Sequence, residues 1–187
     1  MQESTGSGRQ ARFTHIANHY QQHYQKLEAA GHAPYRLTRL GAWATSIASH
    51  VFAFFEHIDL TRYRLFLDLG SGDGVVACIA GLFTRAVGIE IDAELCSTAQ
   101  QAVRHLGLED QVAIVCGDYR SQHIRGADCL YIYPDKPVLE VETLLEGWPG
   151  SLIVGGPHFP LERFTATLQF RIARDQMVLY HNRVTLC

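Results

Sequence analysis

The residues best suited to bind a ligand lie in one glycine-rich segment, Asp68 to Gly74. An apolar run, Leu65 to Leu67, leads into this segment, and a second one, Val75 to Phe83, follows it. Glycine adopts positive φ without strain and lets the backbone approach a ligand closely. In an open α/β sheet such a turn lies at the edge where ligands bind, and the helix after it presents free N–H groups. The segment therefore predicts a ligand-binding turn, although a tight turn without a ligand has the same composition. The candidate binding residues are Asp68, Gly70, Ser71, Gly72 and Gly74.

A carboxylate, Glu90, stands at the end of the next apolar run, 20 residues after Gly70. At this position of a βαβ unit a carboxylate can accept hydrogen bonds from both hydroxyls of a ribose. The glycines have the spacing GxGxG, whereas dinucleotide-binding turns have GxGxxG. The pattern weighs against a nicotinamide-dependent dehydrogenase, which is the alternative from another enzyme class.

Short apolar runs alternate with helical patterns after residue 63, and this alternation predicts βαβ units with a parallel sheet covered on both faces. The expected strands are 65–67, 86–91, 111–116, 129–133 and 151–154, and the expected helices are 75–83, 93–105 and 138–146. Residues 164–173 and 177–186 alternate with period two around a polar break, which favours an antiparallel hairpin. The predicted fold class is α/β, with a doubly wound, mostly parallel seven-stranded sheet that ends in this hairpin.

Two helical patterns, 13–27 and 38–57, precede the sheet. We expect a disordered tail over residues 1–10, N-terminal helices over 11–58 packed on the main domain, and the main domain over 59–187. The second helical pattern and its approach contain bulky and basic residues that could cover a ligand or could only fill the core. These residues are Tyr35, Arg36, Arg39 and Trp43.

The sequence resembles the class I, Rossmann-like S-adenosylmethionine methyltransferases. The resemblance spans residues 63–154 and is specific at three segments, Asp68–Gly74, Val87–Asp92 and Gly117–Tyr119. The sheet of that family also finishes with an antiparallel strand.

The resemblance implies S-adenosylmethionine as cofactor and assigns expected roles to residues of this chain. Glu90 would bind the ribose hydroxyls and Ile91 would pack on the adenine. Asp118 would accept from the adenine amino group, with Tyr119 beside the ring. The residues implied for the methionine part are Asp68, Gly70 and Gly72.

The methyl acceptor is expected past the fourth strand, where the chain reads Tyr133-Pro134-Asp135-Lys136. Family members that methylate base amino groups carry Asp/Asn-Pro-Pro-aromatic there, so this departure weighs against nucleic-acid amino-methylation. Tyr133 and Asp135 are candidate catalytic residues that could orient an acceptor or take its proton. A strand-end tyrosine and a turn aspartate are the structural alternative, because methyl transfer does not require a general base.

The net charge, the apolar runs and the cysteines of the chain limit which partners and cofactors we expect. The net charge is −3, there is no apolar run long enough to span a membrane, and the N-terminal residues show no signal-peptide pattern. The five cysteines match no zinc-binding spacing, so we expect reduced thiols, no metal and a cytoplasmic chain. A protein side chain or a small molecule is favoured as acceptor over nucleic acid. An RNA methyltransferase and a non-catalytic S-adenosylmethionine-binding module remain alternatives, and the oligomeric state stays open.

Overall fold

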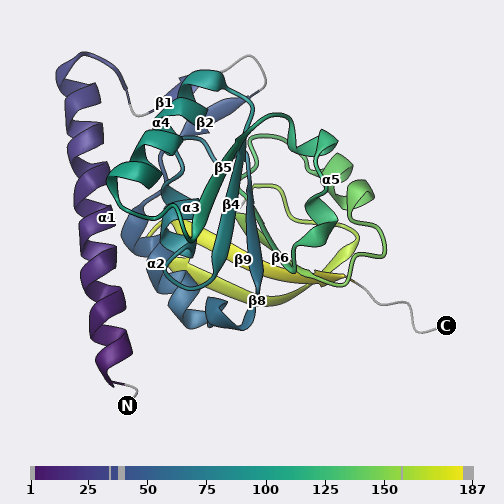
Figure 1. Ribbon diagram of the computed structural model, residues 1–187. Coiled ribbons are helices and arrows are strands. Elements are labelled where there is room, and N and C mark those ends of the chain that lie inside the picture. Colours follow the sequence, from purple (N-terminus) through teal and green to yellow (C-terminus); the bar gives the residue numbers. More distant parts are fainter. Residues whose placement is uncertain (1–2, 34, 38–40, 157, 183–187) are drawn as a thin grey trace.

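The centre of the fold is a seven-stranded sheet in the order β5-β4-β3-β6-β7-β9-β8 (Figure 1). The computed structural model describes residues 3–33, 35–37, 41–156 and 158–182. The five strands from β5 to β7 are parallel, while β9 runs antiparallel to both β7 and β8. The predicted fold class and terminal hairpin are confirmed. The strands are β3 (Leu65–Leu69), β4 (Arg85–Glu90), β5 (Val112–Cys116), β6 (Cys129–Ile132), β7 (Ser151–Gly155), β8 (Phe164–Ile172) and β9 (Asp175–Asn182).

Helices cover both faces of this sheet. Four of them, α1 to α4, lie on one side and α5 lies on the other (Figure 1). The period-two alternation of the buried strands divides the core accordingly. In β6, Cys129 and Tyr131 join the cluster that includes α1, α2 and α3, and Leu130 and Ile132 join the cluster that includes α5. The helices are α1 (Glu3–Ala29), α2 (Ala48–His57), α3 (Val75–Ala80), α4 (Ala93–His105) and α5 (Leu139–Leu144).

After β3 the chain builds the sheet toward one edge, through α3, β4, α4 and β5. It then returns to the centre, where β6 pairs with the other edge of β3. Ligands bind at such a reversal of strand order, outside the carboxyl ends of the strands. The topology therefore brings the glycine turn after β3 and the Tyr133 segment after β6 to the same edge.

The N-terminal region differs from its prediction. Residues 3–10, expected to be disordered, form the first turns of α1. The helix is anchored by Phe13, Ile16 and Tyr20, which are buried, and adding residues to an existing helix is easier than nucleating one. No helix in the described part of the chain is long and apolar enough to cross a membrane.

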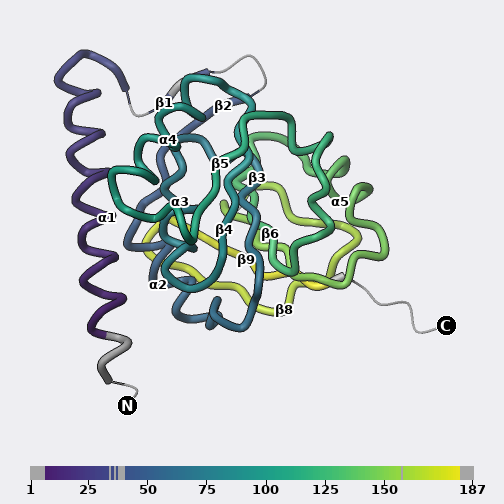
Figure 2. Tube along the Cα trace, in the orientation of Figure 1, coloured from purple at the N-terminus to yellow at the C-terminus, as the bar shows by residue number. Residues whose placement is uncertain are grey.

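The helix predicted over residues 38–57 is correct only for its second half. Residues 42–44 form β2 (Ala42–Ala44), which pairs antiparallel with β1 (Tyr35–Leu37), and α2 begins at Ala48 after the extended residue Ile47. Residues 38–40, including Arg39, lie outside the described residues. Figure 2 follows the chain from α1 through the β1–β2 segment into α2.

Candidate active site

The turn between β3 and α3 is fixed to the end of β4 by its backbone. The N–H groups of Gly70 and Ser71 both donate to the carbonyl oxygen of Ile89, at 2.9 and 3.0 Å. Gly70, Gly72 and Gly74 have φ values of +79°, +56° and +85°. This left-handed backbone explains the GxGxG spacing, because residues with a β-carbon rarely adopt it.

Two of these glycines also give room to neighbouring elements. A β-carbon on Gly72 would lie 2.4 Å from the indole of Trp43, which comes from β2. A β-carbon on Gly74 would lie 2.8 Å from Ala99 of α4. At Gly70, by contrast, a β-carbon would meet no described atom within 4 Å. The open side of the turn is therefore at Gly70.

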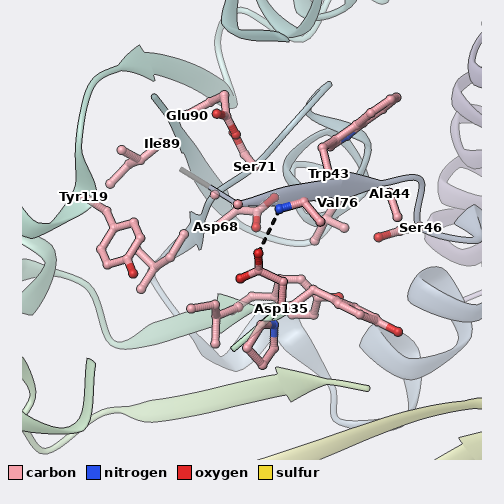
Figure 3. A pocket seen from close by; sticks show the side chains of 18 of the residues that line it. Trp43, Ala44, Ser46, Asp68, Ser71, Val76, Ile89, Glu90, Tyr119 and Asp135 are labelled. Atoms are coloured by element: carbon pink, nitrogen blue, oxygen red, sulfur yellow. Dashed lines mark hydrogen bonds between the residues drawn. The ribbon is translucent and has the colours of Figure 1, made fainter. Parts of the chain in front are cut away.

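A cavity of about 530 Å³ lies beside this turn at the carboxyl edge of the sheet. Small-molecule sites typically measure roughly 300–1,000 Å³. The ends of β3, β4 and β6 form one wall, and β2 with the loop before α2 forms another (Figure 3). Gly72 and Gly74 are absent from the described lining, which agrees with their packing roles. The predicted site residues that line the cavity are Asp68, Gly70, Ser71, Glu90, Ile91, Asp118, Tyr119, Tyr133 and Asp135.

Three carboxyl groups, those of Asp68, Asp73 and Glu90, are buried together at the turn. Burial raises the pKa of Asp68 well above its usual range, and the nearby carboxylates of Glu90 and Asp73 raise it further. Burial also raises the pKa of Asp73 to about 6, although a hydrogen bond from Tyr24 opposes the shift. Both effects penalise negative charge in the ligand-free site, so a cation bound here would be stabilised by the cluster.

Glu90 is held in place by two backbone donors. Its Oε2 accepts from the N–H of Gly72 at 2.8 Å, and its Oε1 accepts from the N–H of Asp92 at 2.7 Å. A carboxylate oxygen can accept more than one hydrogen bond, so both oxygens keep capacity for a ligand. Glu90 thus braces the turn and can also bind hydroxyl groups in the cavity.

Three buried polar atoms beside the cavity have no hydrogen-bond partner among the described residues. They are Asp68 Oδ2, Ser71 Oγ and the Tyr131 hydroxyl, and all three residues line the cavity. Leaving a buried polar group unsatisfied costs about 1–3 kcal/mol. A polar ligand that pairs with these atoms removes that cost.

The side of the cavity at β4 and β5 presents an apolar surface next to an ion pair. Ile91 is 39% exposed and Tyr119 is half-buried. Asp118 accepts from the Arg120 Nε at 2.9 Å through each carboxylate oxygen, and this contact lowers its pKa. A ligand amino group would therefore have to share Asp118 with Arg120, which the sequence did not indicate.

The β1–β2 segment is attached over the cavity. Asp135 Oδ2 accepts from the backbone N–H of Ala42 at 2.8 Å (Figure 3, dashed line), and the Trp43 indole packs on Gly72. Tyr133 is 54% exposed and lines the cavity, so it lies at the mouth and not in the core. Asp135, a candidate proton acceptor, therefore also anchors β2 through its hydrogen bond with Ala42.

Sequence reasoning missed a link from α1 to the glycine turn. The Tyr20 hydroxyl donates to the backbone carbonyl of Asp73 at 3.0 Å, and the Tyr24 hydroxyl donates to Asp73 Oδ2 at 2.8 Å. It also missed Asp175 of β9, which lines the cavity and lies 2.6 Å from Nδ1 of His50. Only the aromatic residues of α1 at helical spacing gave a signal, and they indicate packing.

Comparison with known families decides the class of protein. The sequence model of the protein-L-isoaspartate(D-aspartate) O-methyltransferase (PCMT) family matches residues 15–127, more than half of the chain. The chain belongs to the PCMT family. It is an S-adenosylmethionine-dependent methyltransferase, as the resemblance at the glycine turn and Glu90 implied.

Solved structures share the fold of this PCMT-family chain at low sequence identity. An RNA methyltransferase from Salinibacter ruber, in complex with S-adenosyl-L-homocysteine, is 23% identical, with a TM-score of 0.65 over 78% of this chain and 97% of that chain. A methyltransferase from Geobacter sulfurreducens is 16% identical, with a TM-score of 0.61 over 84% and 85% of the two chains. The mitomycin 7-O-methyltransferase MmcR is 15% identical, with a TM-score of 0.59 over 72% of this chain and 53% of that chain. No curated protein matches the sequence.

The residues of the cavity fit S-adenosylmethionine. The cofactor carries a cationic sulfonium, a ribose with two hydroxyls and a flat adenine. The buried acidic cluster suits the cation, Glu90 has acceptor capacity for hydroxyls, and the exposed side chain of Ile91 offers an apolar surface. The unpartnered atoms of Asp68 and Ser71 add polar groups for the rest of the cofactor.

Proposed function

We propose that this PCMT-family enzyme transfers a methyl group from S-adenosylmethionine to a protein side chain or a small molecule that enters the cavity beside Tyr133. The observation that carries the proposal is the cavity itself, which joins the open glycine turn at Gly70 to the segment after β6. The bound cofactor supplies an electrophilic methyl group, and the protein supplies orientation and electrostatics.

The cofactor roles proposed for individual residues follow the cavity wall. Asp68, Gly70 and Ser71 lie at the methionine part, and Glu90 binds the ribose hydroxyls. Ile91 and Tyr119 flank the adenine, and Asp118 accepts from its amino group while it remains paired with Arg120. The glycine geometry and the buried acidic cluster support these assignments.

The acceptor side is less constrained by family membership. The name of the family refers to methylation of a carboxyl oxygen, but the matched segment ends at residue 127, before β6. Tyr133 and Asp135 therefore lie outside the match. Among the similar structures one is an RNA methyltransferase, and the acidic cavity of this chain weighs against a polyanionic acceptor.

The proposal is tested by incubating the full chain with S-adenosylmethionine labelled in the methyl group and cell extract fractionated into proteins, RNA and small molecules. We expect label in the protein or small-molecule fraction, and S-adenosylhomocysteine should inhibit the transfer. Label confined to RNA would contradict the proposed acceptor class. Absence of label from every fraction would favour a non-catalytic binding module.

A further inference from the structure

The described lining of the cavity is strongly acidic. Seven carboxyl side chains line it, against two basic ones, those of Arg120 and Lys136. The guanidinium of Arg120 already pairs with Asp118 and lies 3.6 Å from Glu140. Like charges in a low-dielectric cavity repel, so this lining disfavours an anionic acceptor and attracts a cationic one.

A buried hydroxyl in the same cavity points to a ligand that forms hydrogen bonds. The Tyr131 side chain is only 2% exposed, and its hydroxyl makes no hydrogen bond of good geometry in the described part of the chain, although the Ser46 side chain lies near enough to oppose the rise in its pKa. Burial, with a further contribution from Asp68, raises the pKa of this phenol, so it stays protonated. Gly155 gives it room, because a β-carbon there would lie 2.8 Å from the hydroxyl oxygen. The hydroxyl oxygen can accept an N–H bond from a ligand.

A carboxylate from the terminal hairpin completes this part of the cavity. Asp175 of β9 lines the cavity, and the 2.6 Å contact with His50 Nδ1 holds its Oδ2. A β-carbon on Gly155 would lie 2.5 Å from the Tyr133 ring and 2.8 Å from the Tyr131 hydroxyl, and Gly155 pairs with Met177 of β9, two residues after Asp175. The site thus combines a proton acceptor with two phenol groups.

The mouth of the cavity suits an alkyl chain. Tyr35, Ile47 and Tyr133 all line the cavity and are 52%, 52% and 54% exposed. Exposed aromatic and aliphatic side chains around an acidic interior match a molecule with an apolar stem and a cationic end.

We propose that the acceptor is a primary aliphatic amine, as in a lysine side chain or a free alkylamine, and that Asp175, Tyr131 and Tyr133 form its binding site. The proposal rests on the methyl transfer proposed above. The Asp175 carboxylate takes one proton from the ammonium group, and the freed lone pair on nitrogen forms the new C–N bond. The C–S bond to the methyl carbon breaks as the C–N bond forms, and its electron pair stays on sulfur. The product leaves as a secondary ammonium, and the Asp175 carboxyl then releases its proton to water, which restores the carboxylate.

The first test uses the full chain with methyl-labelled S-adenosylmethionine and three defined probes: Nα-acetyl-lysine methylamide, butylamine and an isoaspartyl peptide. A fourth arm uses extract proteins. We expect label on an amine probe or on lysines of extract proteins, and the label should resist mild alkali. The lysine and butylamine arms distinguish a protein side chain from a free amine as the source.

Methyl esters, unlike methylamines, release methanol in mild alkali. Label that is alkali-labile, or absent from every amine arm while S-adenosylhomocysteine binds the chain, would overturn the amine proposal. Failure of S-adenosylhomocysteine to bind would overturn the proposed function itself, so the two failures are distinguishable.

The second test uses variants on the amine substrate that is labelled. Asp175→Asn should lower kcat/KM by about 100-fold or more, the usual scale for loss of a general base. Tyr131→Phe should lower it about tenfold and should leave the melting temperature unchanged or higher, since an unpartnered buried hydroxyl is removed. Asp110→Asn, at an exposed turn before β5, is the control. Wild-type rates in both site variants would contradict the proposal.

Discussion

At the scale of single residues, the main feature of the site is an aspartate buried where its charge is unfavourable. Asp68 is 2% exposed and lies beside Glu90 and Asp73. A cationic ligand compensates for this charge, but the ligand-free protein carries the cost. Binding residues of this kind are selected for function at the expense of stability.

Asp68→Asn should therefore stabilise the ligand-free protein in a pH-dependent way. The ordinary pKa of this carboxyl is 3.8, and the folded protein raises it. Above about pH 4 the folded state of the wild type binds more protons than the unfolded state, so its stability falls as pH rises, and the variant lacks this loss. The melting temperature of the variant minus that of the wild type should increase between about pH 4 and pH 7.

Thermal melts without ligand measure this difference, with Asp110→Asn as an exposed control whose difference should stay constant. Asp68→Asn should also weaken S-adenosylhomocysteine binding. A melting-temperature difference that is constant or shrinks with rising pH would show that folding does not raise the pKa of Asp68.

At the scale of elements, α1 acts on the cofactor turn as well as on the core. Its tyrosines hold both the carbonyl and the side chain of Asp73, in the middle of the glycine turn. A helix packed on one face of the sheet thereby fixes the backbone that faces the ligand. The N-terminal helix is thus expected to affect cofactor affinity although it supplies no residue to the described lining of the cavity.

Tyr24→Phe removes the hydrogen bond to Asp73 Oδ2 and keeps the ring. A net hydrogen bond contributes about 0.5–1.5 kcal/mol, so the Kd for S-adenosylhomocysteine should rise about two- to tenfold. Tyr63→Phe is a matched control, because its hydroxyl donates to Ser151 at 2.9 Å at the amino edge of the sheet. Calorimetry should show weaker binding in the first variant only, and equal effects would indicate general destabilisation.

The β1–β2 segment is the second element with an expected role in binding. Its bond from Ala42 to Asp135 joins it to the loop after β6. Asp135→Ala removes the hydrogen bond that attaches the β1–β2 segment to the loop after β6. The dissociation rate of S-adenosylhomocysteine should therefore increase several-fold. Stopped-flow fluorescence of Trp43 can follow this rate.

The same variant separates the two roles of Asp135. A residue that only anchors the β1–β2 segment changes the dissociation rate of S-adenosylhomocysteine, whereas a proton acceptor lowers kcat without changing cofactor affinity. An unchanged dissociation rate together with a large loss of kcat would restore Asp135 as the catalytic residue that the sequence suggested.

At the scale of the whole molecule, the sheet and the cofactor side were predictable because their signals are local. Apolar runs of strand length and the GxGxG spacing are visible in a few consecutive residues, and Glu90 follows at a fixed distance. The β1–β2 segment over the cavity was not predictable. β1 and β2 have three residues each, and the apolar residues around Trp43 also fit a helical period.

The acceptor side could be predicted only in part. Tyr133 and Asp135 line the cavity as expected, because they directly follow a strand. Tyr131 lies within an apolar strand, so the sequence pattern did not indicate that its hydroxyl would line the cavity. Asp175 and His50 are 125 residues apart and meet only through tertiary packing. Long-range pairs of this kind leave no pattern in a single sequence.

The proposed site requires that S-adenosylmethionine binds at the carboxyl edge of the sheet. Isothermal titration of the full chain with S-adenosylhomocysteine tests this most directly, with NADH and the Glu90→Gln variant as comparisons. We expect one molecule bound per chain, no binding of NADH, and a loss of about 1–3 kcal/mol in Glu90→Gln, which leaves ribose hydroxyls without their charged acceptor. Binding of NADH without S-adenosylhomocysteine, or unaltered affinity in the Glu90 variant, would contradict the account.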